Sequence, residues 1–108
     1  MKQRELVTPP KQQEFDERVA ICTVDGGMSD REAFAVAVGQ MPDATRQECP
    51  RAWKRLNRQW RAVVSDVYGQ DKMQIAHDSL KKKYGVDSFK GLTLGQIMAS
   101  IEKLEAKQ

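Results

Sequence analysis

The stretch from Pro50 to Tyr68 constrains this chain most, because it separates apolar and basic side chains onto two faces of one helix. Its apolar residues recur every three or four positions, which is the period of a helix face: Trp53, Leu56, Trp60, Val63, Val64 and Val67. Between them stand cations, with no carboxylate before Asp66: Arg51, Lys54, Arg55, Arg58 and Arg61. We predict a long central helix that ends at Gly69, buries its tryptophan face and turns its basic face toward an anion.

The first third predicts two helices joined by a glycine turn. Thr8 followed by Pro9 favours a helix start, and this helix should run to Val24, where Asp25-Gly26-Gly27 interrupts it. Ser29 and Glu32 form a capping box that opens a second, short helix, which we expect Gly39 to end. We expect these side chains to face the core: Phe15, Val19, Cys22 and Met28.

The arrangement over residues 8–39 is similar to a helix-turn-helix, with the glycine as its turn and Ser29 as its cap. The second helix carries only Arg31 as a cation, between Asp30 and Glu32. That charge pattern is poor for reading DNA, so we interpret this segment as a helical corner without DNA contact.

The last third predicts a C-terminal helical hairpin over residues 70–104. The first helix covers 70–84 and closes at Gly85, with an apolar face formed by Met73, Ile75, Ala76, Leu80 and Tyr84. After a compact connection, Thr93 and Gln96 form a second capping box. The last helix buries Leu94, Ile97, Met98, Ile101 and Leu104. Strand signals are nearly absent, so we predict an all-α fold of about five helices in one domain, residues 1–108, with fraying ends at 1–7 and 105–108.

Enzymatic and metal chemistry find little support in the sequence. The single histidine, His77, stands beside Asp78 without a catalytic motif, and no phosphate loop, dinucleotide loop, nucleophile elbow or zinc spacing is present. Cys22 and Cys49 lack a metal-ligand spacing, and we expect both to be reduced. We therefore expect a protein that is not an enzyme and needs no cofactor or metal. Without a signal peptide or an apolar run that could span a bilayer, the expected location is the bacterial cytoplasm.

The basic helix is the best candidate site. Cations four residues apart point the same way and can reach neighbouring phosphates of a duplex, so the predicted phosphate contacts are Arg51, Lys54, Arg55, Arg58 and Arg61. Asn57 and Gln59 flank them and could reach base edges. Lys81, Lys82 and Lys83 are expected either to add a phosphate contact or only to complement the dipole at their helix end. DNA is favoured over RNA, because no exposed aromatic platform is evident.

Three alternatives remain open at this point. The cations could form a solvated face with no ligand, or they could bind an acidic protein of a phage or its host, as an interaction module or inhibitor would. The chain could also be an oligomeric assembly or packaging adaptor. Trp53 and Trp60, seven residues apart, would allow a homodimer seam, although we expect them to lie in the core.

Two segments resemble bacteriophage proteins. Leu80–Thr93, which contains Lys81-Lys82-Lys83-Tyr84-Gly85-Val86 and Ser88-Phe89-Lys90, resembles a helical hairpin at the C-terminus of phage antirepressors and some recombination-associated proteins. Thr8-Pro9-Pro10-Lys11-Gln12 and the alanine-rich Ala33–Gly39 resemble the opening of small terminase subunits. These resemblances imply a phage or prophage origin, and they imply core positions for Tyr84, Val86, Phe89 and Leu92.

Overall fold

The computed structural model describes residues 8–108, so the expected fraying of residues 1–7 lies outside the described part. Five α-helices and two short 3₁₀ helices follow one another: α1 (Pro10–Val24), α2 (Asp30–Gln40), α3 (Pro50–Tyr68), η2 (Gln70–Lys72), α4 (Met73–Tyr84), η3 (Phe89–Gly91) and α5 (Leu94–Glu105). No strand occurs within residues 8–108. The predicted all-α class and the number of helices are confirmed.

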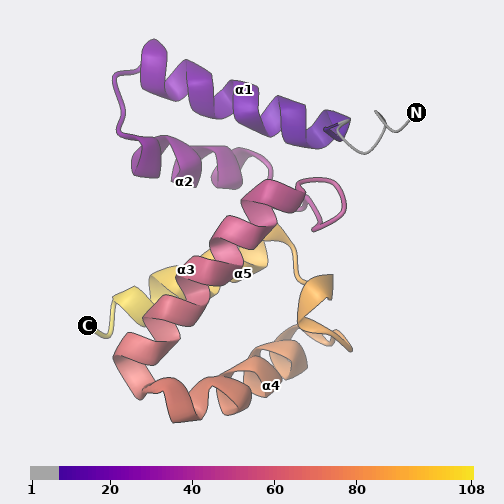
Figure 1. Ribbon diagram of the computed structural model, residues 1–108, viewed down its shortest axis with the longest axis vertical. Coiled ribbons are helices and arrows are strands. Elements are labelled where there is room, and N and C mark those ends of the chain that lie inside the picture. The colour runs from indigo at the N-terminus through magenta and orange to yellow at the C-terminus, as the bar shows by residue number, and fades with distance from the viewer. Residues whose placement is uncertain (1–7) are drawn as a thin grey trace.

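The predicted central helix α3 is the spine of the molecule. Its tryptophan face packs along α5, the α1–α2 pair crosses its N-terminal end, and α4 returns below it (Figure 1). Most of the large apolar side chains that are fully buried come from α3, from α5 and from Leu92 just before α5, and α2 adds Val38: Trp60, Leu56, Val64, Leu92, Leu94, Ile97, Ile101 and Val38. The amphipathic pattern of Pro50–Tyr68 therefore fixes where the core lies.

Both indoles are core residues, as expected. Trp53 and Trp60 are 4% and 1% exposed, and both pack against the ring of Phe89, with centroids 6.2 Å and 4.8 Å away. Each ring nitrogen also has a partner, since Trp53 Nε1 donates to the Leu92 carbonyl and Trp60 Nε1 to Ser100 Oγ, both at 2.9 Å. A buried indole whose N–H is satisfied stabilises the fold, so the heptad spacing serves the core of one molecule.

The helix ends follow most of the local signals. Both capping boxes form, at Ser29 with Glu32 and at Thr93 with Gln96, and Gly85 ends α4 with a left-handed φ of 67°. Three boundaries differ from the prediction: α1 begins at Pro10 rather than Pro9, α2 continues through Gly39 to Gln40, and α4 begins at Met73, after the 3₁₀ helix η2 over the predicted residues 70–72. Glu105 is still helical, and only the residues after it leave the helix.

The α1–α2 pair is an antiparallel hairpin, with the two helices side by side and running in opposite directions (Figure 1). The steep crossing of a helix-turn-helix is absent from it. The end of this hairpin projects beyond α3, which explains why Met28 is 37% exposed rather than a core plug. Phe15 is buried as predicted, whereas Val19 and Cys22 are half-buried.

The two cysteines are unpaired, as expected. Cys49 is completely buried just before α3, and burial raises the pKa of its thiol to about 11. It is therefore a protonated apolar side chain at neutral pH, with no nucleophilic character.

Candidate nucleic-acid interface

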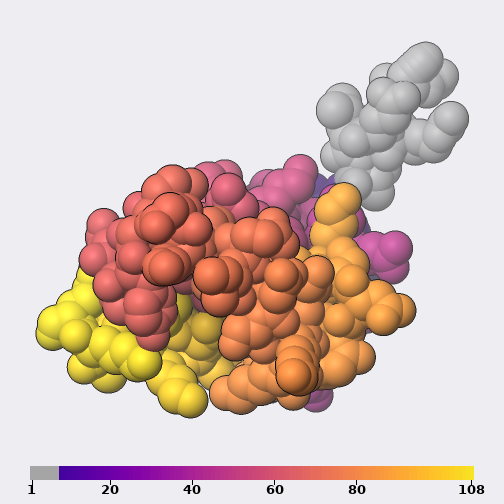
Figure 2. Space-filling model, turned by 90° about the horizontal axis from the view of Figure 1, so that it is seen from below, coloured from indigo at the N-terminus to yellow at the C-terminus, as the bar shows by residue number. Residues whose placement is uncertain are grey.

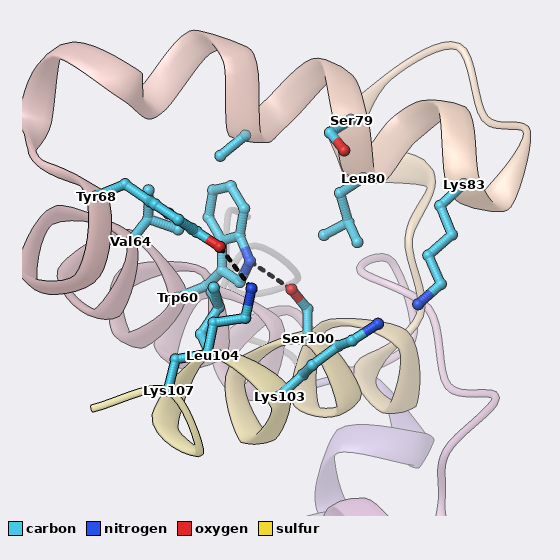
Figure 3. Close-up of a pocket in the computed structure, with 11 residues that line it drawn as sticks. Trp60, Val64, Tyr68, Ser79, Leu80, Lys83, Ser100, Lys103, Leu104 and Lys107 are labelled. Atoms are coloured by element: carbon cyan, nitrogen blue, oxygen red, sulfur yellow. Dashed lines mark hydrogen bonds between the residues drawn. The ribbon is translucent and has the colours of Figure 1, made fainter.

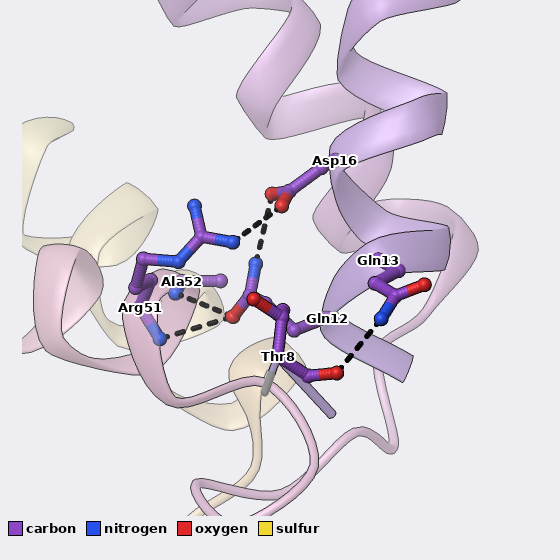
Figure 4. Close-up of polar contacts among 6 residues, drawn as sticks. All are labelled: Thr8, Gln12, Gln13, Asp16, Arg51 and Ala52. Carbon is purple, nitrogen blue, oxygen red and sulfur yellow. Dashed lines mark hydrogen bonds and ion pairs between the residues drawn. The ribbon is translucent and has the colours of Figure 1, made fainter. Parts of the chain in front are cut away.

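The N-terminus of α3 is held by a side chain from α1. Gln12 is the one buried polar residue among residues 8–108, with 1% exposure. Its Oε1 accepts from the backbone N–H groups of Arg51 (3.0 Å) and Ala52 (3.3 Å), and its Nε2 donates to Asp16 Oδ1 (2.9 Å; Figure 4). Because α3 has no side-chain cap of its own, Gln12 satisfies donors that would otherwise be orphaned at the helix start.

Two of the five predicted phosphate-binding cations are already paired within the molecule. Arg51 Nη2 contacts Asp16 Oδ2 on α1. Arg55 Nη2 lies 3.0 Å from Asp30 Oδ2 on α2, and the same guanidinium stacks 4.0 Å from the ring centroid of Phe34. These two arginines fasten the α1–α2 hairpin to α3, so the expectation that they are free to hold phosphates is corrected.

The other three cations of α3 form what we call the basic ridge, defined as Lys54, Arg58 and Arg61. All three are exposed, and none has an ion pair with a carboxylate of residues 8–108. Arg61 follows Lys54 by seven residues, which corresponds to about 10 Å along the helix axis. The ridge is the part of the predicted face that remains available to an external anion.

His77 joins the ridge from α4. Its ring stacks on Phe89, with centroids 4.3 Å apart, and lies edge-on to Trp60 at 5.1 Å. Its Nε2 is 3.5 Å from Arg61 Nη1. Burial, Arg61 and Lys81 lower the pKa of His77, against a smaller opposing effect of Asp78, so the imidazole is neutral at pH 7 and supports the ridge without adding charge.

The three lysines at the end of α4 do not act as one cluster. Lys81 lies near His77 and pairs with Asp78, with Nζ 3.4 Å from Oδ1. Lys82 is exposed to solvent. Lys83 turns to the other side of α4, where it lines a hollow with Lys103 and Lys107 of the C-terminal segment. Lys81 is therefore the lysine of this group that lies beside the ridge, but its own carboxylate partner already offsets its charge.

The expected base contact by Asn57 is also corrected. Its Oδ1 is buried and has no hydrogen-bond partner among the described residues, because position 57 lies toward the apolar side of α3, close in direction to Val64. Gln59 is half-buried. The buried Oδ1 of Asn57 is therefore not available to a base edge.

Sequence reasoning missed the residues of α1 and α2 that contact the start of α3 and its first arginines: Gln12, Asp16, Asp30 and Phe34. A partial signal exists, since Gln12 shares the inward face of α1 with Phe15 at a spacing of three. Nothing local, however, pairs α1 with the start of α3. Among residues 8–108, no group of three His, Cys, Asp or Glu side chains could hold a metal, and no helix there is both long and apolar enough to cross a bilayer.

Comparison with protein-family models, curated proteins and solved structures finds no match.

Proposed function

We propose that this protein binds nucleic acid without catalysis, through phosphate contacts of the basic ridge. The observation that carries the proposal is the contrast within one helix face. Arg51 and Arg55 have acidic partners, whereas Lys54, Arg58 and Arg61 have none among residues 8–108. Cations that repel one another gain energy when a polyanion lies against them and its counterions are released.

The form of the ridge favours duplex DNA bound without sequence preference. The ridge is straight and spans about 10 Å, and over that length a duplex presents several phosphates. Its neighbouring aromatic rings, Trp53 and Trp60, are buried, so they are not available to stack on splayed bases. The phage or mobile-element setting rests on the sequence resemblance, and it is part of the proposal.

The direct test is fluorescence anisotropy with a labelled generic duplex and the matching single strand at low salt. The double variant Lys54→Glu with Arg58→Glu should lose duplex affinity by at least about tenfold, which corresponds to about 1.4 kcal/mol. Both positions are exposed, so the fold should persist, and circular dichroism would verify it.

The matched control changes the net charge equally at a distance from the ridge. Lys11→Glu with Lys90→Glu alters two exposed lysines that belong neither to the ridge nor to the α4–α5 hollows, and this variant should retain most of the affinity. If the control and ridge variants lose equal affinity, the attraction is nonspecific and the ridge is not a site. If the folded wild type binds neither nucleic acid at low salt, the proposal fails, and an acidic protein partner becomes the better explanation of the ridge.

An assembly adaptor is the second candidate function. One observation favours it: the exposed apolar side chains gather in two regions of opposite charge. Surfaces of opposite charge on one chain could bring copies of that chain together.

A further inference from the structure

The large apolar side chains left exposed on residues 8–108 lie in two places. Ile21, Val24 and Met28, with exposures of 58%, 79% and 37%, lie at the end of the α1–α2 hairpin. Tyr68 at the end of α3 and Ile75 on α4 have exposures of 46% and 63%. The hairpin and α4 are on opposite sides of the molecule (Figure 1). Ile75 was expected on the buried face of its helix, and its exposure shows that this prediction was wrong.

The region beside α4, which we call the α4–α5 groove, consists of two adjoining hollows of about 210 Å³ and 280 Å³ that share Tyr68, Ala76 and Ser79. It exists because α4 and α5 both pack against α3 and scarcely against each other. Its apolar lining comes from Val64, Tyr68, Ile75, Ala76, Leu80 and Leu104. Since an apolar cavity of about 150 Å³ holds a benzene ring, each hollow is large enough for an aliphatic side chain.

The charged residues that line the α4–α5 groove are all lysines. Its lining residues include Lys72, Lys83, Lys103 and Lys107 but no aspartate or glutamate. Lys83 from α4 and Lys103 from α5 point toward one another across the gap (Figure 3). Figure 2 shows the same side of the surface, where the yellow end of α5 lies beside the orange residues of α4. Ammonium groups that converge without a counterion favour an incoming carboxylate.

The region at the end of the α1–α2 hairpin, which we call the hairpin tip, combines exposed apolar side chains with negative charge. On the outer face of α1, Ile21 and Val24 are three residues apart, and Glu17 precedes Ile21 by four, so all three point away from α2. Asp25 follows directly and is exposed. No cation occurs between Arg18 and Arg31, so the segment that forms the tip carries carboxylates and no positive charge of its own.

We propose that copies of this protein join head to tail, with the hairpin tip of one copy seated in the α4–α5 groove of the next. Ile21 and Val24 would occupy the two hollows, and Glu17 and Asp25 would meet the lysines on the rim. This accounts for both exposed apolar regions with one contact, in the helix-in-groove manner by which amphipathic helices are recognised. It does not depend on the basic ridge or on nucleic acid.

Such a contact uses two different surfaces, so it leaves one tip and one groove free after each addition. Heterologous contacts of this kind close into rings or continue as filaments, and they do not stop at a dimer. The two regions are small compared with stable interfaces, which bury about 1,200–2,000 Å². Association should therefore be weak, concentration-dependent and reduced by salt, because exposed charges are screened over about 10 Å at 0.1 M.

The experiment is a charge exchange, followed by sedimentation velocity over a concentration series at low salt without nucleic acid. The tip variant is Glu17→Lys with Asp25→Lys, and the groove variant is Lys103→Glu with Lys107→Glu. All four positions are exposed, and lysine at the C-terminal end of α1 also suits the helix dipole. Wild type should exceed the mass of a dimer as concentration rises, and each variant alone should associate at least about tenfold more weakly.

Mixing the two variants is the decisive measurement. A basic tip then meets an acidic groove and an acidic tip meets a basic groove, so association should return to the wild-type level. An independent uncharged variant, Val24→Ser, should weaken association without altering the helix content. A wild type that is monomeric at every concentration would overturn the proposal, and so would folded variants that fail to associate when mixed. A wild type that stops at a dimer would also overturn it, in favour of a two-fold interface.

Discussion

The side-chain oxygen of Gln12 accepts a hydrogen bond from the backbone N–H of Arg51, 39 residues later in the chain, at 3.0 Å. A residue of the first helix thus caps the helix that carries the candidate site. The same glutamine orients Asp16, whose carboxylate pairs with the Arg51 guanidinium. The start of α3 and its first cation are fixed by the α1–α2 hairpin rather than by their own neighbours in the sequence.

Replacing Gln12 with alanine should destabilise the protein by about 1–3 kcal/mol, because two backbone donors and Asp16 lose a buried partner. The measurement is urea unfolding followed by circular dichroism. Gln13→Ala is the matched control, since Gln13 is exposed and should change stability by less than about 0.5 kcal/mol. Equal effects at both positions would mean that the buried cap contributes nothing.

The salt dependence of duplex binding should report how many cations remain available. Three ridge cations give a slope of about −3 for log K against log salt, whereas the five cations of the whole α3 face would give about −4.5. Anisotropy titrations at several salt concentrations measure this slope. Arg58→Ala should make it shallower by about one, and Arg55→Ala should leave it nearly unchanged, because Arg55 already pairs with Asp30. If both variants made the slope shallower by the same amount, the distinction between paired and available cations would be contradicted.

Stability should fall as the solution is acidified below about pH 6.5, the ordinary pKa of histidine. The folded protein lowers the pKa of His77, so in this window the unfolded chain binds the proton and the folded chain does not, which favours unfolding. Urea unfolding between about pH 7 and pH 5 measures the loss. His77→Asn removes the only histidine of the chain and should flatten this part of the profile. Parallel profiles for both proteins would assign the loss to carboxylates instead.

Two glycines should respond to alanine in opposite directions. A Cβ at Gly95 would lie 2.7 Å from the Cβ of Pro42 and 2.9 Å from its carbonyl oxygen, so Gly95→Ala should destabilise the protein by about 1–3 kcal/mol. Gly39 lies within α2 with open space around it, so Gly39→Ala should stabilise by up to about 1 kcal/mol. Thermal unfolding of both variants tests the pair, and a change of the same sign in both would contradict it.

The helices could be predicted because their signals are local. The pattern of Pro50–Tyr68 specifies a period, a buried face and two ends, and the capping boxes at Ser29 and Thr93 need only residues three positions apart. The exposure of Ile75 has a local reason as well, which its assignment to the apolar face of the helix overlooked. Ile75 follows Met73 by two residues and precedes Leu80 by five, so on α4 it points away from these two buried side chains.

The candidate site could be predicted only in part. The spacing of Lys54, Arg55 and Arg58 shows that they share one basic face, but the carboxylates that pair with cations of this face come from other helices. Asp30 reaches Arg55 across 25 positions, and that pairing depends on how the α1–α2 hairpin crosses α3. Local charge patterns therefore identify the face and overestimate how much of it is free.

The contact between Arg61 and His77 gives the basic ridge a second property. An anion bound beside Arg61 would offset the positive field that disfavours protonation of the imidazole, so the complex would hold a proton more tightly than the free protein does. By thermodynamic reciprocity, mild acidification would then tighten anion binding, and each binding event near pH 6 would draw protons from the buffer. Calorimetry in two buffers of different ionisation enthalpy would reveal that uptake as a difference in the apparent heat of binding.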